Sequence, residues 1–117
     1  MIKNLEKTFK ALSDSSRLRI LKMLQIRSLC LCEIQEVLGL AGATVSKHLS
    51  ILRDAGFLES EKRGTWVYFR LHHSTQKLFA KRMLSVLKQW LPEDEIIQKD
   101  IKKIKSMSAD KTCNAGQ

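Results

Sequence analysis

The sequence predicts a small, mostly helical domain with one β-hairpin. Its 117 residues, of which 44% are hydrophobic, are enough for a single domain with a modest core. Through most of the chain, apolar residues recur every three to four positions, as in amphipathic helices. Between residues 57 and 71 the spacing changes to two, which is typical of a half-buried strand.

The first half of the chain predicts four helices, at residues 2–12, 15–25, 30–38 and 43–55. Ser13 or Asp14 can cap the second helix, because a short polar side chain accepts a hydrogen bond from the free N–H groups of the first turn. Gly39 suits the end of the third helix, because glycine adopts a left-handed conformation without strain. The fourth helix therefore follows the third after a tight connection.

The second half predicts a hairpin and two further helices. Val67, Phe69 and Leu71 should line one face of a strand, and the turn of the hairpin falls at Arg63-Gly64-Thr65. A long helix is expected at residues 75–91, ended by Pro92.

We divide the chain into a domain at residues 1–92 and a C-terminal extension at residues 93–117. The spacing of apolar residues in the extension predicts one more amphipathic helix, which ends at about residue 105. From Ser106 the sequence has no periodicity, so we expect that part to be flexible.

Composition narrows the function classes. A formal net charge of +9 suits a polyanionic partner such as nucleic acid, although residues 43–72 carry only five basic against three acidic residues. No apolar run approaches the roughly 20 residues of a membrane span, and the N-terminus lacks the apolar core of a secretion signal. We therefore expect a cytoplasmic protein without a membrane partner. An odd number of cysteines, at positions 30, 32 and 113, argues against a disulfide framework.

Two short helices, a tight turn and a hairpin form the layout of a winged helix-turn-helix, in which the second short helix enters the major groove of DNA. The side chains opposite its apolar face are small, polar or basic: Thr44, Ser46, Lys47 and His48. Arg63 at the hairpin tip can reach a phosphate or the minor groove. The same pattern also fits the solvated face of a helical domain that does not bind DNA.

Three segments, SDSSRLRILKML, LCLCEIQEVLGL and TVSKHLSILRDAGFLESEKRGTWVYFRL, closely resemble the ArsR/SmtB family of bacterial metal-responsive repressors. The resemblance covers about residues 5–91 and implies a homodimer joined through its first and last helices. It implies binding to palindromic double-stranded operator DNA, and release when an inducer binds. It also implies DNA contacts at Thr44, Ser46, Lys47 and His48 of the reading helix and at Arg63 and Thr65 of the wing. Where the family often has a base-reading glutamine, this chain has Ala41-Gly42-Ala43, so readout through phosphates and DNA shape should weigh more.

The stretch Leu29-Cys30-Leu31-Cys32-Glu33 matches the thiol motif of the arsenic- and cadmium-sensing branch of that family. The resemblance implies that Cys30 and Cys32 are metal ligands, whereas the alternative is a pair of buried cysteines. In a regular helix residues i and i+2 are about 200° apart, so both sulfurs reach one ion only if the helix is distorted or begins between them. We therefore expect binding to deform the first turn of this helix and to displace the reading helix.

The inducer follows from the ligand set. Thiolates select soft ions, and trivalent arsenic or antimony takes three sulfurs. Some arsenic sensors of the family have a third cysteine at the position of Gln35. The cadmium sensors recruit cysteines from an N-terminal arm, whereas this chain has no cysteine before Cys30. Cys113, from the same or the partner subunit, either completes the site or has no role.

The expected function is a repressor that needs no cofactor to bind DNA and is induced by trivalent arsenic or antimony. The alternatives are sensing of cadmium or lead, sensing of thiol oxidation or reactive sulfur through Cys30 and Cys32, or a winged-helix adaptor that ignores DNA. We do not expect an enzyme, because no nucleophile is paired with a base at a recognisable spacing.

Overall fold

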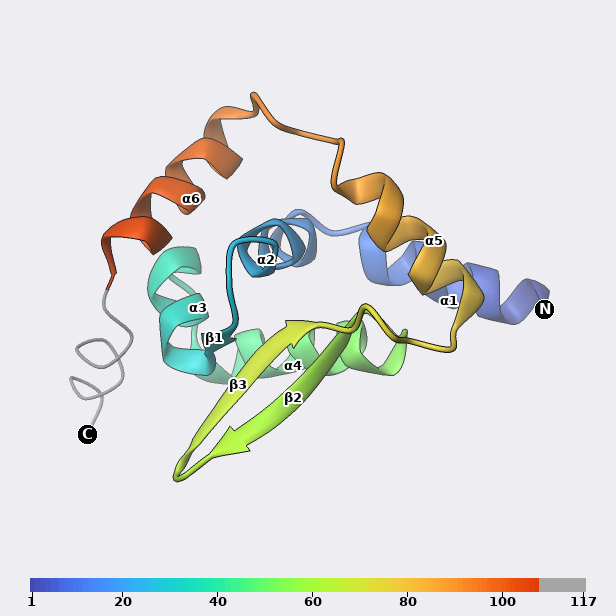
Figure 1. The fold of residues 1–117 in the computed structure, drawn as a ribbon, viewed down its shortest axis with the longest axis horizontal. Coiled ribbons are helices and arrows are strands. Elements are labelled where there is room, and N and C mark those ends of the chain that lie inside the picture. Colours follow the sequence, from blue (N-terminus) through green and yellow to red (C-terminus); the bar gives the residue numbers. More distant parts are fainter. Residues whose placement is uncertain (108–117) are drawn as a thin grey trace.

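The protein is described by a computed structural model over residues 1–107, which contain six helices and a three-stranded sheet (Figure 1). Cys113 and most of the segment predicted to be flexible lie outside these residues. The elements follow one another as α1 (Ile2–Leu12), α2 (Ser15–Leu24), β1 (Leu29–Cys30), α3 (Leu31–Leu38), α4 (Gly42–Asp54), β2 (Leu58–Arg63), β3 (Trp66–Leu71), α5 (Leu78–Leu87) and α6 (Glu95–Ser106).

The ends of the first helices follow local chemistry. Asp14 caps α2, because its carboxylate accepts a hydrogen bond from the Arg17 N–H at 3.0 Å. Gly39 ends α3 in a left-handed conformation at φ 69°, as predicted. The predicted start of this helix is one residue early: Cys30 has an extended backbone, and the helix begins at Leu31.

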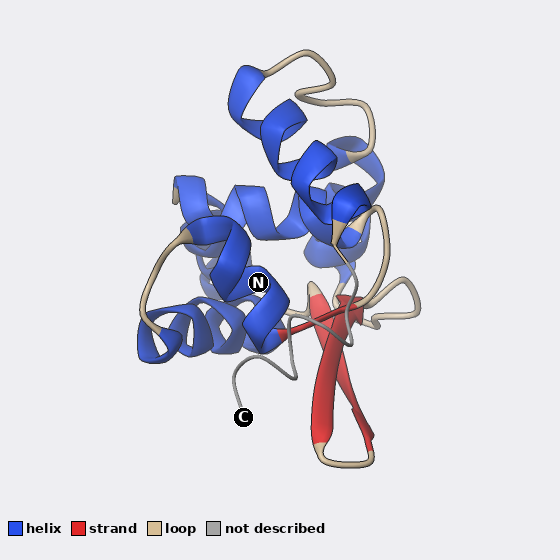
Figure 2. Ribbon diagram, turned by 90° about the vertical axis from the view of Figure 1, so that its left-hand side faces the viewer, coloured by secondary structure: helices blue, strands red, loops and turns tan. Residues whose placement is uncertain are grey.

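The sheet has the strand order β1-β3-β2, and both pairings are antiparallel. The hairpin is confirmed, and its two long strands project away from the helices as a wing (Figure 2). The predicted apolar face of β3 is confirmed toward the base of the wing, where Leu71 is buried and the half-buried Phe69 packs against the core; Val67, nearer the tip, is 41% exposed. The sequence did not predict β1, because two residues are too few to show a period.

The core lies between the helices and the base of the hairpin. The predicted inner face of α4 is confirmed, because Val45, Leu49 and Leu52 are all buried. Ile34 of α3 and Phe57, just before β2, are also fully buried in the same cluster. α4 is therefore anchored along its inner side and leaves its outer side free for a partner.

The helix α5 is shorter at both ends than the predicted 75–91. Its C-terminal end is fixed from outside by Lys22 of α2, whose ammonium donates to the carbonyls of Leu87 and Trp90 at 3.0 and 2.7 Å. Lys22 is only 6% exposed, and this burial lowers its pKa. A tertiary contact from another helix thus ends α5 before Pro92 does.

The predicted C-terminal helix is confirmed as α6, which packs against α2 and α3 (Figure 1). Its Asp100, 5% exposed, receives two hydrogen bonds from the Arg19 guanidinium at 2.8 and 2.9 Å. Near its C-terminal end, the Lys103 ammonium donates to the Glu36 carbonyl of α3 at 3.2 Å. The last described residues therefore lie beside α3.

Within residues 1–107, the structure contains no helix of the length and apolarity that a membrane span requires.

Candidate functional site

The outer side of α4 presents the residues that the sequence predicts to contact DNA. Thr44, Ser46 and Lys47 are exposed, and His48 is half-buried. They share the N-terminal half of α4, where the helix dipole also favours a negatively charged partner. The helix lies next to the hairpin, so the two predicted DNA contact regions are neighbours (Figure 1).

His48 is held by a residue that the sequence analysis did not single out. Its Nδ1 lies 3.1 Å from Nη1 of Arg17, at the start of α2. A guanidinium has no acceptor, so Nδ1 accepts this hydrogen bond and the imidazole proton resides on Nε2. The contact fixes both the tautomer and the direction of the ring.

The tip of the wing carries Arg63 and Thr65, both exposed. Arg63 is not an isolated charge: its Nη2 lies 3.1 Å from a carboxylate oxygen of Glu61, and its guanidinium lies 4.5 Å from the centre of the Tyr68 ring. Arg70 contacts Glu59 and Glu61 from the neighbouring strand, at 3.1 and 2.9 Å. These exposed pairs reduce the positive charge of the wing and orient its arginines.

The two cysteines of the thiol motif lie on either side of a helix start. Cys30 ends β1 and is 1% exposed, and Cys32 lies half-buried in the first turn of α3. Their Sγ atoms are 3.4 Å apart. Two sulfurs that bind one tetrahedral ion at about 2.3 Å are about 3.8 Å apart, so the pair is within a few tenths of an ångström of ligand geometry. Of the two geometric conditions predicted above, the structure meets the second, since the helix begins between the cysteines.

A buried carboxylate organises this helix start. Glu33, fully buried, accepts a hydrogen bond from the Cys30 N–H at 2.9 Å. Its second oxygen lies 3.0 Å from Nη2 of Arg27, in the segment before β1. The pair satisfies one of the free N–H groups of the helix start and balances the buried charge. The sequence predicted Glu33 as part of the thiol motif but gave no sign of its partner.

The environment of Cys32 raises the pKa of its thiol, chiefly because burial disfavours the thiolate and secondarily because Glu33 is negatively charged. At neutral pH this thiol therefore keeps its proton, and a soft ion that bound its sulfur would have to displace that proton. Thiols that react readily with oxidants usually have a lowered pKa instead. This environment suits a metal ligand better than a redox-reactive group.

The sulfurs of Cys30 and Cys32 could supply only part of an arsenic site, because trivalent arsenic takes three sulfurs. Among residues 1–107, no group of three or more His, Cys, Asp or Glu side chains is arranged to hold an ion. Cys113, the third predicted ligand, lies outside the described residues.

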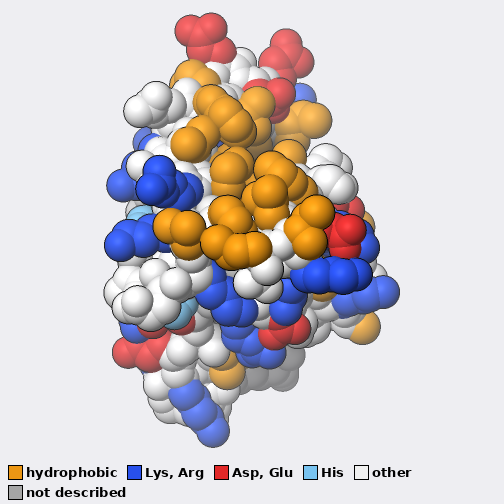
Figure 3. Space-filling view, turned by 90° about the vertical axis from the view of Figure 1, so that its right-hand side faces the viewer, with side chains coloured by type: hydrophobic (Ala, Val, Ile, Leu, Met, Phe, Trp, Pro, Cys, Tyr) orange, Lys and Arg blue, Asp and Glu red, His pale blue; other side chains and the backbone are white. Residues whose placement is uncertain are grey.

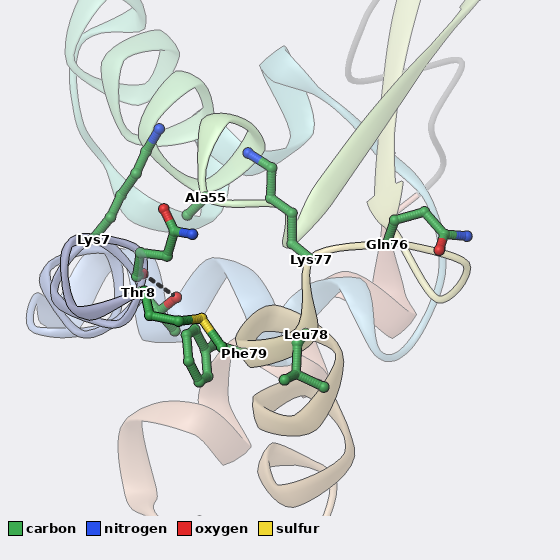
Figure 4. A pocket seen from close by; sticks show the side chains of 9 residues that line it. Lys7, Thr8, Ala55, Gln76, Lys77, Leu78 and Phe79 are labelled. Carbon is green, nitrogen blue, oxygen red and sulfur yellow. Dashed lines mark hydrogen bonds between the residues drawn. The ribbon is translucent and has the colours of Figure 1, made fainter.

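A further hollow of about 300 Å³ lies between α1, the end of α4 and the start of α5 (Figure 4). The amino groups of Lys7 and Lys77 lie on its α4 side, and Leu78 and Phe79 on its α5 side. The Lys77 ammonium donates to the Asp54 carbonyl at the end of α4. This lysine therefore caps a helix and is not a spare charge for a ligand.

Comparison with known proteins agrees with the winged helix-turn-helix fold. The model of the bacterial regulatory proteins of the arsR family matches residues 14–60. The arsenic resistance transcriptional regulator ArsR1 of Pseudomonas putida is 35% identical over 92 residues, which cover 75% of this chain and 72% of that protein. The chain belongs to the ArsR family of bacterial regulatory proteins. It is thus a winged helix-turn-helix, DNA-binding transcriptional repressor of the ArsR type.

Two other proteins extend the comparison. A cadmium resistance transcriptional regulatory protein, a CadC homolog of Staphylococcus aureus, is 38% identical over 66 residues, or 56% of this chain and 54% of that protein. Among solved structures, reduced HlyU from Vibrio cholerae N16961 superposes with a TM-score of 0.64 at 26% identity, over 78% of this chain and 92% of that one. The similarity supports the winged-helix fold but does not identify the inducer.

Proposed function

We propose that this ArsR-family repressor binds its operator as a homodimer and releases it when trivalent arsenic or antimony binds the thiolates of Cys30, Cys32 and Cys113. The observation that carries the proposal is the 3.4 Å separation of the Cys30 and Cys32 sulfurs across the start of α3. The arsenic resistance regulator of Pseudomonas putida supports the choice of metalloid.

The dimer interface is the apolar face formed by α1 and α5, seen as a continuous hydrophobic area in Figure 3. Exposed Phe9 and Trp90 flank a groove between the two helices. Apolar residues make up most of its lining: Phe9, Leu12, Leu18, Met83, Leu87, Trp90 and Leu91. A contiguous apolar surface of this kind marks an interaction site, and a second copy of the chain is the partner that the family resemblance implies.

In the proposed complex, α4 enters the major groove. Thr44, Ser46, Lys47 and His48 contact bases and phosphates there. Arg63 and Thr65 reach the DNA backbone or minor groove from the wing. Four of the six residues lie on α4 and two lie at the tip of the β2–β3 hairpin. Because α4 packs next to β2, all six can contact one duplex.

The position of α6 supports Cys113 as the third ligand from the same subunit. The contact between Lys103 and Glu36 places the end of α6 about one helical turn beyond Cys32. Five residues separate Met107 from Cys113, and the six steps along an extended chain span at most about 22 Å. This length of chain supports a third thiol from the same subunit.

Two connections lead from the thiols to the DNA-binding surface. Cys30 pairs with Tyr68 in the β1–β3 ladder, and the Tyr68 ring carries the guanidinium of Arg63. On the other side, α3 packs against α4 across the turn at residues 39–42. A change at the start of α3 therefore acts on the wing and on the reading helix together. Roughly 1–3 kcal/mol of coupling is typical of allosteric proteins and is enough for operator release.

The proposal is tested by an anaerobic titration of the reduced protein with arsenite, followed by the ultraviolet absorption of arsenic–sulfur bonds. We expect saturation at one arsenic per subunit, and weaker binding by the Cys113→Ser variant. Unchanged binding by that variant would remove Cys113 from the site. No absorption change in either protein would exclude arsenic as the inducer.

Cadmium is the second candidate inducer, favoured by the similarity to the CadC homolog. Cadmium usually takes three or four ligands, as zinc does in its protein sites. The same titration with cadmium, followed by cadmium–thiolate absorption, separates the two. Operator release by cadmium at concentrations where arsenite has no effect would reverse the order of the candidates.

We expect Lys47→Ala to weaken operator binding about tenfold or more and to leave arsenite binding intact. Lys47 is exposed on the reading face, and a hydrogen bond to a charged phosphate contributes about 1.5–3 kcal/mol. A duplex is first enriched from a random library by the unmodified protein. Fluorescence anisotropy with this duplex then measures the change in affinity. Lys99→Ala on α6 is the control. Equal affinity of the Lys47 variant and the unmodified protein would contradict the assignment of the reading face.

A further inference from the structure

We propose that Arg17, at the start of α2, is a DNA-contacting residue that binds a backbone phosphate in the hollow between α2 and α4. The inference rests on the proposed insertion of α4 into the major groove. It extends the DNA contacts beyond the reading helix and the wing to a third element.

The Arg17 guanidinium is fixed before any DNA arrives. Its Nε donates to the Ala11 carbonyl at 2.8 Å, and its Nη2 donates to the Lys10 carbonyl at 3.1 Å. These two carbonyls belong to the end of α1, where the helix dipole favours a cation. The third contact, from Nη1 to His48 at 3.1 Å, ties the guanidinium to α4.

This arrangement leaves some N–H donors of the Arg17 guanidinium available for a ligand. A guanidinium has five N–H groups, and three of those of Arg17 are engaged by acceptors within residues 1–107. The other two remain available beside the reading helix. A preorganised guanidinium with two spare N–H groups matches the oxygens of a phosphate, which arginine often binds in a bidentate manner.

The hollow itself has the composition of a phosphate site. Its lining contains two cationic side chains, one imidazole and one hydroxyl, with no carboxylate: Arg17, Ala43, Thr44, Lys47, His48 and Ile51. Because the His48 proton resides on Nε2, the imidazole adds a further donor. The carboxylate of Asp14 accepts a hydrogen bond from the backbone N–H of Arg17 at the start of α2 and is not part of this lining.

The ligand is a phosphate of the DNA backbone, since the same hollow includes Thr44 and Lys47 of the reading face. When a helix lies in the major groove, the phosphates that border the groove pass along its sides. A phosphate in contact with Lys47 is then also beside Arg17 and His48. Arg17 therefore fixes the depth and register of α4, as phosphate contacts do, without reading sequence.

The test measures how the affinity for the selected duplex depends on salt. Each phosphate contact contributes about 0.9 to the slope of log K against log salt, so Arg17→Gln, which removes one contact per subunit, should reduce the slope of the dimer by about 1.8. Lys99→Gln, an equal loss of charge on α6, should leave the slope unchanged. If Arg17 only supports the fold, its variant will lose thermal stability or affinity with an unchanged slope, which would overturn the proposal.

A second measurement uses the unmodified protein, so it does not depend on the folding of a variant. Side-chain NMR of the ¹⁵N-arginine-labelled, unmodified protein follows the Nη resonances of Arg17. We expect them to shift on addition of the duplex and not of inorganic phosphate at the same ionic strength. Resonances that stay in place when the duplex saturates the protein would overturn the proposal. A shift on addition of inorganic phosphate would show that the site binds a free anion, which would overturn the assignment to a DNA phosphate. Failure of the unmodified protein to enrich any duplex would instead contradict the DNA-binding function itself.

Discussion

Replacing Cys32 with serine should give a repressor that binds its operator normally and no longer releases it. With arsenite, the operator affinity of the unmodified protein should fall about a hundredfold, near the upper end of typical allosteric coupling. The Cys32→Ser variant should change by less than about threefold, because a hydroxyl has nearly the shape of a thiol and is a poor ligand for soft ions. Anisotropy of the selected duplex, with and without arsenite, measures both values.

The structure explains why this substitution separates sensing from DNA binding. The start of α3 is held by the Cys30 N–H and the carboxylate of Glu33, a bond in which the Cys32 side chain takes no part. The DNA-binding residues lie on α4, which buried Val45, Leu49 and Leu52 anchor, and on the wing, whose strands β2 and β3 pair with each other. The variant without arsenite therefore serves as its own control and should match the unmodified protein. Release of the duplex by arsenite from Cys32→Ser would place the sensing site elsewhere.

The reading helix illustrates what the sequence can predict. Val45, Leu49 and Leu52 recur at helical spacing, so the buried side of α4 and, by exclusion, its outer side follow from periodicity. The same reasoning overestimated the length of α5, because the C-terminal end of α5 is set by Lys22 from another helix. A contact across 65 residues leaves no trace in local periodicity.

The thiol motif shows a different limit. Its residues were recognised by resemblance, and the helical spacing of positions i and i+2 correctly posed the geometric problem. The solution, a helix that begins between Cys30 and Cys32, depends on the pairing of β1 with β3. That pairing joins segments about 40 residues apart and fixes the extended backbone of Cys30.

Arg17 and Arg27 mark the part of the sites that the sequence analysis missed. Each looks like one of many basic residues in a chain of net charge +9. Arg17 acquires its role from carbonyls of α1 and from His48 of α4. Arg27 acquires its role from the burial of Glu33 six residues later. In both cases the partners are selected by packing and not by a local pattern.

Replacing Arg27 with alanine should lower the free energy of unfolding by about 3 kcal/mol. Glu33 is fully buried, and Arg27 is the cation beside its second oxygen at 3.0 Å. Removal of one partner from a buried ion pair typically costs about 3–5 kcal/mol, because the other charge stays in a medium of low dielectric constant. We use the lower end of this range because the Arg27 side chain is 33% exposed. Urea denaturation at a fixed protein concentration measures the change.

A double variant tests the cause. In Arg27→Ala with Glu33→Gln, the amide oxygen can still accept the hydrogen bond from the Cys30 N–H, and no buried charge remains. The double variant should therefore recover a large part of the stability lost by Arg27→Ala alone. Arg70→Ala is the matched control, because its partners Glu59 and Glu61 are on the exposed wing, and it should change stability little. If the double variant is less stable than Arg27→Ala, the loss comes from packing of the arginine stem, and the carboxylate does not depend on Arg27 for its charge balance.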